Sequence, residues 1–409
     1  AVVVGGRGGK SFPSGEDADY RFDRLDGGSV RSGRAADRND VELGRAVYET
    51  PPEDAAEQTT EEGGSAEAVP SFDPSDLVAG GVLGSGAFCE IRTITSIGPA
   101  VPIDGGGAEE ALLPTTDLRT GVDGGGAPRP VVKVLRTDLS EVDGRSGLAD
   151  LLNEADHLRT LRHPHVVRLR GVSSAVGDND GRCFLVLERL RCTLEERIGE
   201  WEERSRPIHS PMSAIYYSEH VRTLIRTLAE ERRGAAYGIA SALHYVHGKK
   251  IVYRDLKPQN IGFDARGRIR LFDFGLARDL ARAPARGDSF LLTGRTGTLR
   301  YMAPEVFREE PYGPPADVYS FGIVLWYLHA LRVPFSGYSC AMYERMVVGE
   351  DRRPPVDAAW GPAVCDLLGA CWDPGPGARP SFAGVCGVLA TRGACGGGAA
   401  AASPRGTFA

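Results

Sequence analysis

The sequence predicts an α+β fold, because strand-like and helix-like segments occur together in a chain with enough apolar residues for a core. Two stretches rich in β-branched residues, "LVAGGVLGSGAFCEIRTI" from residue 77 and "RPVVKVL" from residue 129, are typical of strands. In "GLADLLNEADHLRTL", residues 147–161, the apolar residues have helical spacing. The chain has 409 residues and 42% hydrophobic content, which suits one large domain or two ordinary ones.

Further elements follow along the chain. The segment "CFLVLERL", residues 183–190, predicts another strand, and "AAYGIASALHYVHGKK", residues 235–250, predicts a helix. The short strand-like segment "IRLF" leads directly into Asp273. No internal repeat accompanies them.

Composition excludes several function classes. A net charge of -7 and a pI near 5.7 argue against a nucleic-acid partner, which calls for a basic face. The most apolar run, residues 321–335, is broken by His329 and Arg332, so it falls short of the roughly 18 apolar residues that a membrane span needs. The 8 cysteines contain no C-x-x-C pair, which favours free thiols and a cytoplasmic location. The chain begins with Ala1 rather than methionine, so the sequence leaves open whether it is a fragment that lacks a targeting signal.

The chain divides into a folded region and polar flanks. Residues 1–75 are rich in Gly, Ser, Asp, Glu and Arg, so we expect them to be disordered. We expect a folded domain over residues 77–391 and a low-complexity tail over residues 392–409. Within the domain, residues 93–129 contain two GGG runs and predict a surface insertion. A polar stretch at residues 197–232 predicts a second insertion, with helices of its own.

The stretch "LGSGAFCEI" predicts a phosphate-binding turn. Glycines at 84 and 86 lack a Cβ, so backbone N–H groups can approach a polyphosphate closely, although Cys89 stands where a third glycine would complete G-x-G-x-x-G. The stretch alone is weak evidence. The candidate nucleotide-binding residues in it are Leu83, Gly84, Ser85, Gly86, Ala87, Phe88, Cys89, Glu90 and Ile91.

The decisive segment is "IVYRDLKPQNIGFDARGRIRLFDFG", residues 251–275. Here the chain resembles a eukaryotic protein kinase: H-R-D-L-x-x-x-N occurs as "YRDLKPQN", followed by "DFG" and by "APE" at 303–305, and preceded by the lysine strand "VVKVL". The resemblance runs from about Leu77 to Ala390. It implies a bilobal protein kinase fold, with a small, mainly β N-lobe that carries one helix (77–190) and a larger, mainly α C-lobe (191–391).

The resemblance also implies catalytic roles. Lys133 would bind the α- and β-phosphates of ATP and pair with Glu154, Asp255 would accept the proton of the substrate hydroxyl, and Lys257 would stabilise the γ-phosphate. Two further residues would hold Mg²⁺ through hard oxygen ligands; they are Asn260 and Asp273.

Other matched positions form the adenine side of the site. Leu187 would lie at the back wall, and Glu188 to Leu190 would form the hinge. Val131 replaces the usual alanine above the adenine, and Gly262 replaces a leucine-like residue below it, so we expect the two changes to compensate in volume. Tyr253 stands in place of the usual histidine and would pack beneath Phe274.

The type of kinase follows from flanking motifs. Lys257 together with Thr298 resembles Ser/Thr-specific kinases, so the partners implied are protein substrates with Ser or Thr hydroxyls. The segments "DVYSFGIVLW" and "CWDPGPGARPSF" resemble the tyrosine-kinase-like group, in which Arg379 would form a buried structural pair with Glu305.

Regulation by an upstream activating kinase is a further expectation. Arg254 precedes the catalytic aspartate, which suggests phosphorylation of the loop 273–305, with Arg278 as a second cation. Thr293 and Thr296 are the leading acceptors and Ser289 a weaker one. The alternative is that this loop is mobile and that the kinase is constitutively active without phosphate on it.

Four alternatives remain open. The chain could be a pseudokinase scaffold that binds nucleotide without turnover, or an interaction protein built on its N-terminal region, which would leave the catalytic set unexplained. His163 and His165 in "RHPHVV" invite a metal site but fit a structural loop better. For Cys89 we weigh an exposed thiol whose pKa is lowered by Lys133 against an inert one.

Overall fold

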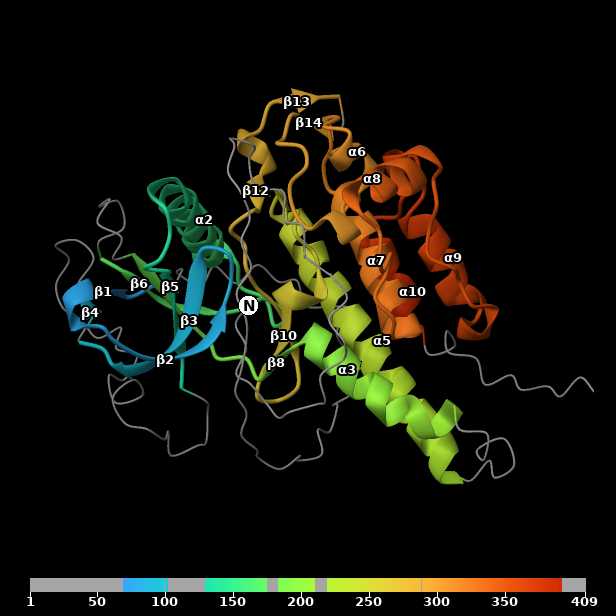
Figure 1. Cartoon of the computed structure of the whole chain (residues 1–409), viewed down its shortest axis with the longest axis horizontal. Coiled ribbons are helices and arrows are strands. Elements are labelled where there is room, and N and C mark those ends of the chain that lie inside the picture. Colours follow the sequence, from blue (N-terminus) through green and yellow to red (C-terminus); the bar gives the residue numbers. More distant parts are fainter. Residues whose placement is uncertain are drawn as a thin grey trace, which may run out of the picture.

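A computed structural model describes residues 69–98, 100–101, 129–174, 183–209, 219–287 and 289–391. The chain forms two lobes: a twisted sheet with one long helix against it, and a larger, mainly helical part (Figure 1). The bilobal α+β fold predicted by the sequence is therefore confirmed. Among these residues, no helix combines the length and the apolar character that a membrane crossing needs.

The N-lobe sheet has 7 strands in the order β2-β3-β5-β7-β6-β1-β4. Neighbours pair antiparallel except β1 and β6, which are parallel. The strands are β1 Ser71–Phe72, β2 Val78–Ser85, β3 Cys89–Ser96, β4 Ala100–Val101, β5 Val131–Leu135, β6 Leu169–Ser173 and β7 Phe184–Leu187.

Helix α2, Glu141–Thr160, packs on one face of this sheet (Figure 1). The Ser140 side chain caps its N-terminus by accepting from the Asp143 N–H at 3.2 Å. Leu151, Ala155 and Leu158 form its buried apolar face, at the spacing the sequence predicts. The same face carries the buried Glu154 into the interior.

The C-lobe consists mainly of helices. α5 spans Glu219–Gly248 and crosses the centre of the lobe, where it contacts α3, α7 and α10. The helices are α3 Leu194–Ser205, α5 Glu219–Gly248, α6 Pro304–Phe307, α7 Pro315–Ala330, α8 Cys340–Tyr343, α9 Pro362–Cys371 and α10 Phe382–Ala390, with a π-helix over Glu344–Gly349. Its short strands are β8 Cys192–Thr193, β9 Ile251–Val252, β10 Ile261–Phe263, β11 Ile269–Leu271, β12 Arg278–Asp279, β13 Ala285–Arg286 and β14 Ser289–Phe290. Short 3-10 turns complete the described elements of both lobes. They are η1 Pro74–Asp76, η2 Arg206–His209, η3 Pro258–Asn260, η4 Leu280–Arg282, η5 Leu299–Tyr301, η7 Ala358–Trp360 and η8 Pro376–Ala378.

Three predicted boundaries are wrong. The region expected to be disordered ends before residue 75, because Ser71–Phe72 form β1 and Phe72 is buried. Residues 93–96 belong to β3 and pair with β2 and β5 rather than opening an insertion. Residues 197–205 lie in α3, whose Trp201 is fully buried, so the second insertion cannot start at 197. Burial of apolar side chains overrides the local polarity in each case. Residues 1–68, 102–128 and 392–409 lie outside the described residues.

Candidate active site

The glycine turn joins β2 to β3. Gly84 pairs with Ile91 and Ser85 with Glu90, and the Gly86 N–H donates to the Cys89 carbonyl at 2.7 Å. A Cβ on Gly147 of α2 would lie only 2.6 Å from the Cβ of Phe88, so that glycine leaves room for the phenylalanine. The turn is thus held against α2 at one end.

Lys133 lies within ion-pair distance of Glu154, as the sequence predicts. Its Nζ is 2.5 Å from Glu154 Oε2 and 2.9 Å from Asp273 Oδ1. Burial disfavours the charge on Lys133, but the carboxylates of Asp273 and Glu154 outweigh it and raise the lysine pKa. Burial likewise raises the pKa of Glu154, with Lys133 acting against it. One cation therefore bridges β5, α2 and the segment that follows β11.

The loop after β9 places Asp255 at the centre of a polar network. The Thr298 hydroxyl donates to Asp255 Oδ1 at 2.9 Å, and Asn260 Nδ2 donates to Asp255 Oδ2 at 2.9 Å. Lys257 Nζ lies 3.2 Å from Asp255 Oδ2 and donates to Thr298 Oγ1 at 2.8 Å. Asp255 is 3% exposed, so these contacts fix the orientation of its carboxylate.

Buried groups hold this loop from beneath. Asp317 accepts hydrogen bonds from the backbone N–H groups of Tyr253 and Arg254, both at 2.8 Å. The Tyr253 ring packs edge-on against Phe274 with centroids 5.1 Å apart, as predicted, and its hydroxyl donates to the Phe272 carbonyl. Arg254 has a φ of 75°, a left-handed conformation that these contacts stabilise.

Three of the residues expected on the adenine side are apolar and fully buried; they are Val131, Leu187 and Leu190. Val131 pairs with Leu187 across β5 and β7. A Cβ on Gly262 would lie 2.6 Å from Leu190 Cδ1. The space left by the glycine is thus taken by Leu190. The compensation in volume between Val131 and Gly262 stays a prediction.

The Glu188 side chain turns away from the apolar residues around it. Its Oε1 accepts from the Arg168 N–H at 2.9 Å and lies 3.2 Å from Arg270 Nε. Burial raises the Glu188 pKa, which Arg270 opposes. The Glu188 carboxylate is therefore occupied by Arg168 and Arg270.

The expectation that Lys133 would lower the pKa of Cys89 is wrong. Desolvation by burial raises the Cys89 pKa to about 11, and the attraction of Lys133 is too weak to reverse it. Among the described residues, no cluster of three His, Cys, Asp or Glu side chains could hold a metal ion. His163 instead stacks on Tyr245 with centroids 5.0 Å apart, and His165 Nδ1 faces the Ile269 carbonyl at 3.1 Å.

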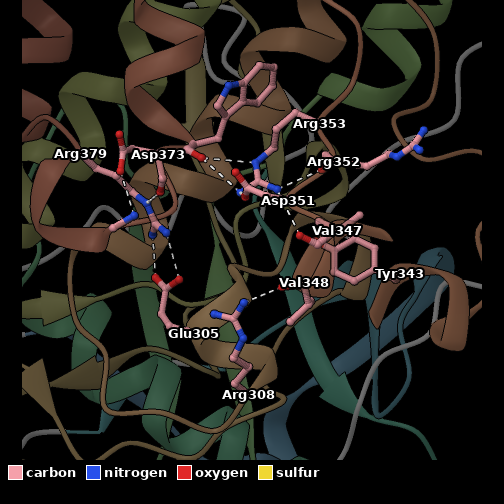
Figure 2. Close-up of polar contacts among 12 residues, drawn as sticks. Glu305, Arg308, Tyr343, Val347, Val348, Asp351, Arg352, Arg353, Asp373 and Arg379 are labelled. Carbon is pink, nitrogen blue, oxygen red and sulfur yellow. Dashed lines mark hydrogen bonds and ion pairs between the residues drawn. The ribbon is translucent and has the colours of Figure 1, made fainter. Parts of the chain in front are cut away.

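Figure 2 shows the predicted pair in the C-lobe. Arg379 contacts Glu305 through two hydrogen bonds of 2.6 and 3.0 Å, and Arg379 Nε donates to the Asp373 carbonyl at 2.9 Å. With the Arg379 side chain fully buried, this bidentate pair fixes the end of the 273–305 loop to the later helices.

Sequence reasoning missed two supporting side chains. Asn153 Nδ2 lies within hydrogen-bond distance of the carbonyls of Phe274, Gly275 and Ala277, at 3.2, 2.7 and 2.9 Å. Tyr312 contacts Arg254, with 2.7 Å between Arg254 Nε and the Tyr312 hydroxyl. Neither residue belongs to a motif that the sequence analysis used, so only the fold reveals them.

The model of the protein kinase domain matches residues 129–388. The chain belongs to the protein kinase family. Among curated relatives, it is 34% identical over 174 residues to the serine/threonine/tyrosine-protein kinase HT1 of Arabidopsis thaliana, covering 42% of this chain and 41% of the relative. It is 30% identical over 244 residues to the serine/threonine-protein kinase CTR1 of the same plant, covering 59% and 26%.

An animal relative extends this set. The kinase is 29% identical over 241 residues to mitogen-activated protein kinase kinase kinase 7 of Drosophila melanogaster, covering 59% of this chain and 31% of the relative. The chain spans less than half the length of each of these three relatives. The relatives support a Ser/Thr protein kinase domain and the resemblance to the tyrosine-kinase-like group.

Proposed function

We propose that this kinase transfers the γ-phosphoryl group of Mg-ATP to Ser or Thr hydroxyls of proteins. The observation that carries the proposal is the Asp255 carboxylate, which is oriented by Thr298, Asn260 and Lys257. A bond forms between the substrate oxygen and the γ-phosphorus while the bond to the β,γ-bridging oxygen breaks, so ADP leaves. The hydroxyl proton passes to Asp255, and Lys257 offsets the charge on the moving phosphoryl group.

ATP would lie between the glycine turn and the C-lobe. Backbone N–H groups of residues 83–91 and the ammonium of Lys133 would bind the phosphates. The adenine would contact the backbone of residues 188–190 and the apolar side chains of Val131 and Leu187. Support comes from the placement of Lys133, which projects from β5 toward Glu154 and Asp273.

Asn260 and Asp273 are the candidate Mg²⁺ ligands. Their carboxamide and carboxylate groups offer the hard oxygen atoms that this ion prefers, and the Asp273 side chain is 20% exposed, within reach of the cleft. The donor set therefore fits the ion. When bound, Mg²⁺ would supply positive charge to the β- and γ-phosphates.

The assay for this function combines Mg-ATP with a generic Ser/Thr substrate and follows transfer of labelled phosphate. Asp255→Asn should lower kcat by about 10² to 10⁴ while the affinity for ATP stays near the wild-type value, since the change removes a proton acceptor. Asp273→Asn is the companion variant for the metal site. Nucleotide binding without turnover by the wild type would indicate the pseudokinase alternative, and equal loss of ATP binding in Asp255→Asn would show that its role is misassigned.

Phosphorylation of the loop 273–305 would regulate the kinase. Arg254 Nη2 donates to Thr296 Oγ1 at 2.9 Å and to the Thr293 carbonyl at 2.8 Å, so a phosphate on Thr296 would meet a guanidinium. Thr293 is exposed to an activating kinase, and Arg278 and Ser289 are the secondary candidates for cation and acceptor. The double variant Thr293→Ala with Thr296→Ala should lower activity in protein purified from activating cells. Full activity there would exclude the switch.

Protein substrates follow from the family. Because one relative is named a mitogen-activated protein kinase kinase kinase, a second kinase is a suitable first protein to test as substrate.

The cysteines that the structure describes are all free, which supports a reducing, cytoplasmic compartment. Fractionation of cells that express the chain would test that location.

A further inference from the structure

Tyr312 joins the loop 273–305 to the entrance of α7. It is 3% exposed, and its backbone exchanges two hydrogen bonds with Phe290, at 2.9 and 3.1 Å. Residue 312 follows α6 and precedes α7, whereas residue 290 ends β14. The backbone of Tyr312 therefore fixes one point of the loop to the rigid C-lobe.

The Tyr312 side chain holds a second point. Its hydroxyl accepts from Arg254 Nε at 2.7 Å and donates to the Thr293 carbonyl at 2.7 Å. A phenol can do both at once, because it has one proton and free lone pairs. The same group thus connects the residue before Asp255 to the loop.

The side-chain partners that the structure gives Arg254 within the described residues are neutral. Besides Tyr312, the guanidinium donates to the carbonyls of Leu276 and Thr293 and to the Thr296 hydroxyl, at 3.2, 2.8 and 2.9 Å. Arg254 is 8% exposed, so these oxygens replace water around a buried cation. These hydrogen bonds give the N–H donors of the Arg254 guanidinium acceptors without a phosphate.

A short backbone path links this cluster to the catalytic aspartate. A Cβ on Gly297 would lie 2.5 Å from the Arg254 carbonyl, and Gly297 has a φ of 96°, so the loop passes very close to Arg254 at a position only glycine suits. The next residue, Thr298, donates to Asp255. Movement of the loop away from Arg254 would therefore disturb the hydrogen bonds of Asp255.

We propose that Tyr312 is a positioning residue, which holds Arg254 and the loop in the productive arrangement while the loop carries no phosphate. A phosphate on Thr296 would bring charged acceptor oxygens to the same guanidinium and take over the place of the Tyr312 hydroxyl. The inference rests on the proposed kinase activity and deepens it, because it names the side chain that the phosphate would replace.

The test compares Tyr312→Phe with Tyr343→Phe in phosphatase-treated protein. Both variants remove one buried hydroxyl that donates to a carbonyl, since the Tyr343 hydroxyl donates to Met302 O at 2.8 Å, but Tyr343 has no contact with Arg254 among its described bonds. Tyr312→Phe should lower kcat about 10-fold or more while KM for ATP is unchanged, because a hydrogen bond to a charged group is lost outside the nucleotide site. Tyr343→Phe should keep kcat at a similar melting temperature.

Three results would overturn the proposal. Wild-type kcat in Tyr312→Phe would exclude a positioning role, and equal losses of kcat in both variants would show a merely structural one. Protein phosphorylated on Thr296, verified by mass spectrometry, should show the same kcat for wild type and Tyr312→Phe, and a persistent loss would exclude the exchange of partners.

Hydrogen exchange separates this inference from the proposed function. In Tyr312→Phe, amides of residues 289–297 should exchange faster than in wild type or Tyr343→Phe, whether or not the chain has turnover. If exchange in Tyr312→Phe is unchanged while the wild type shows catalysis, the role of Tyr312 is refuted and the proposed kinase activity stands. Faster exchange in Tyr312→Phe, together with a wild type that shows no catalysis, would refute the enzymatic proposal and leave the role of Tyr312 in loop order intact.

Discussion

At the scale of single residues, Cys89 illustrates how burial decides reactivity. The thiol lies at the start of β3, near the positive Lys133, yet desolvation raises its pKa to about 11. Two carboxylates that pair with Lys133, those of Glu154 and Asp273, also disfavour the thiolate. Burial and the two carboxylates together therefore outweigh the attraction of Lys133 for the thiolate.

We predict that Cys89 is alkylated by iodoacetamide at pH 8 about 100-fold more slowly than a free thiol, because only the thiolate reacts and its fraction is small so far below a pKa near 11. Since a raised pKa delays deprotonation, the rate should climb steadily as pH increases toward about 11. Mass spectrometry of the modified peptide measures the rate of alkylation, with N-acetylcysteine as the reference thiol. A rate equal to the reference at pH 8 would contradict the raised pKa of Cys89.

At the scale of elements, β1 extends the N-lobe sheet and covers its second face. Phe72 packs in a separate apolar cluster, on the side of β5 opposite to Lys133. Its members are Phe72, Ile94, Ile97, Val132, Phe184 and Val186. A Cβ on Gly171 would lie 2.4 Å from the Phe72 ring, so β6 leaves room for it. Strand β1, which precedes β2 along the chain, is thus part of the folded domain.

Phe72→Ala should therefore lower the free energy of unfolding by about 3–5 kcal/mol, the usual cost of removing a buried aromatic ring. Denaturant titration of the purified chain would measure the change. Val78→Ala is the control, because Val78 is 51% exposed in β2, the next strand along the chain, and should change stability by less than about 0.5 kcal/mol. Equal stability of the two variants would mean that β1 contributes nothing to the fold.

At the scale of the whole molecule, packed histidines make folding depend on pH. His163 stacks on Tyr245 and His329 lies against Trp360 with ring centroids 5.4 Å apart. Burial lowers the pKa of each histidine to about 4, with nearby cationic groups acting in the same direction. The unfolded chain, whose histidines keep pKa values near 6.5, then binds more protons than the folded one as pH falls.

The stability linked to these two groups is complete above about pH 6.5 and is lost as pH falls toward about 4. We predict that the melting temperature decreases between pH 7 and pH 5, and that His329→Gln, which cannot titrate, decreases less over the same interval. Scanning calorimetry in two buffers checks this. An identical decrease in wild type and variant would show that His329 does not contribute.

The sequence by itself determined the kinase architecture and the set of candidate catalytic residues. It could do so because phosphoryl transfer needs a few charged groups at fixed positions along the chain, and such groups form recognisable short motifs. The 2.5 Å contact between Lys133 and Glu154 follows from one strand and one helix whose patterns are local. The buried pair of Arg379 and Glu305 was predictable from its motifs in the same way.

Tertiary structure alone decided what surrounds these groups. Phe72 comes from a polar stretch that local composition reads as disordered, yet it is buried because β6, far along the chain, offers it a parallel strand and a glycine. Leu190 fills the space beside Gly262, and Tyr312 reaches Arg254 across 58 positions of sequence. Solvent access and contacts between distant segments depend on the packed chain, since the free energy of burial is set by neighbours in space rather than by neighbours in sequence.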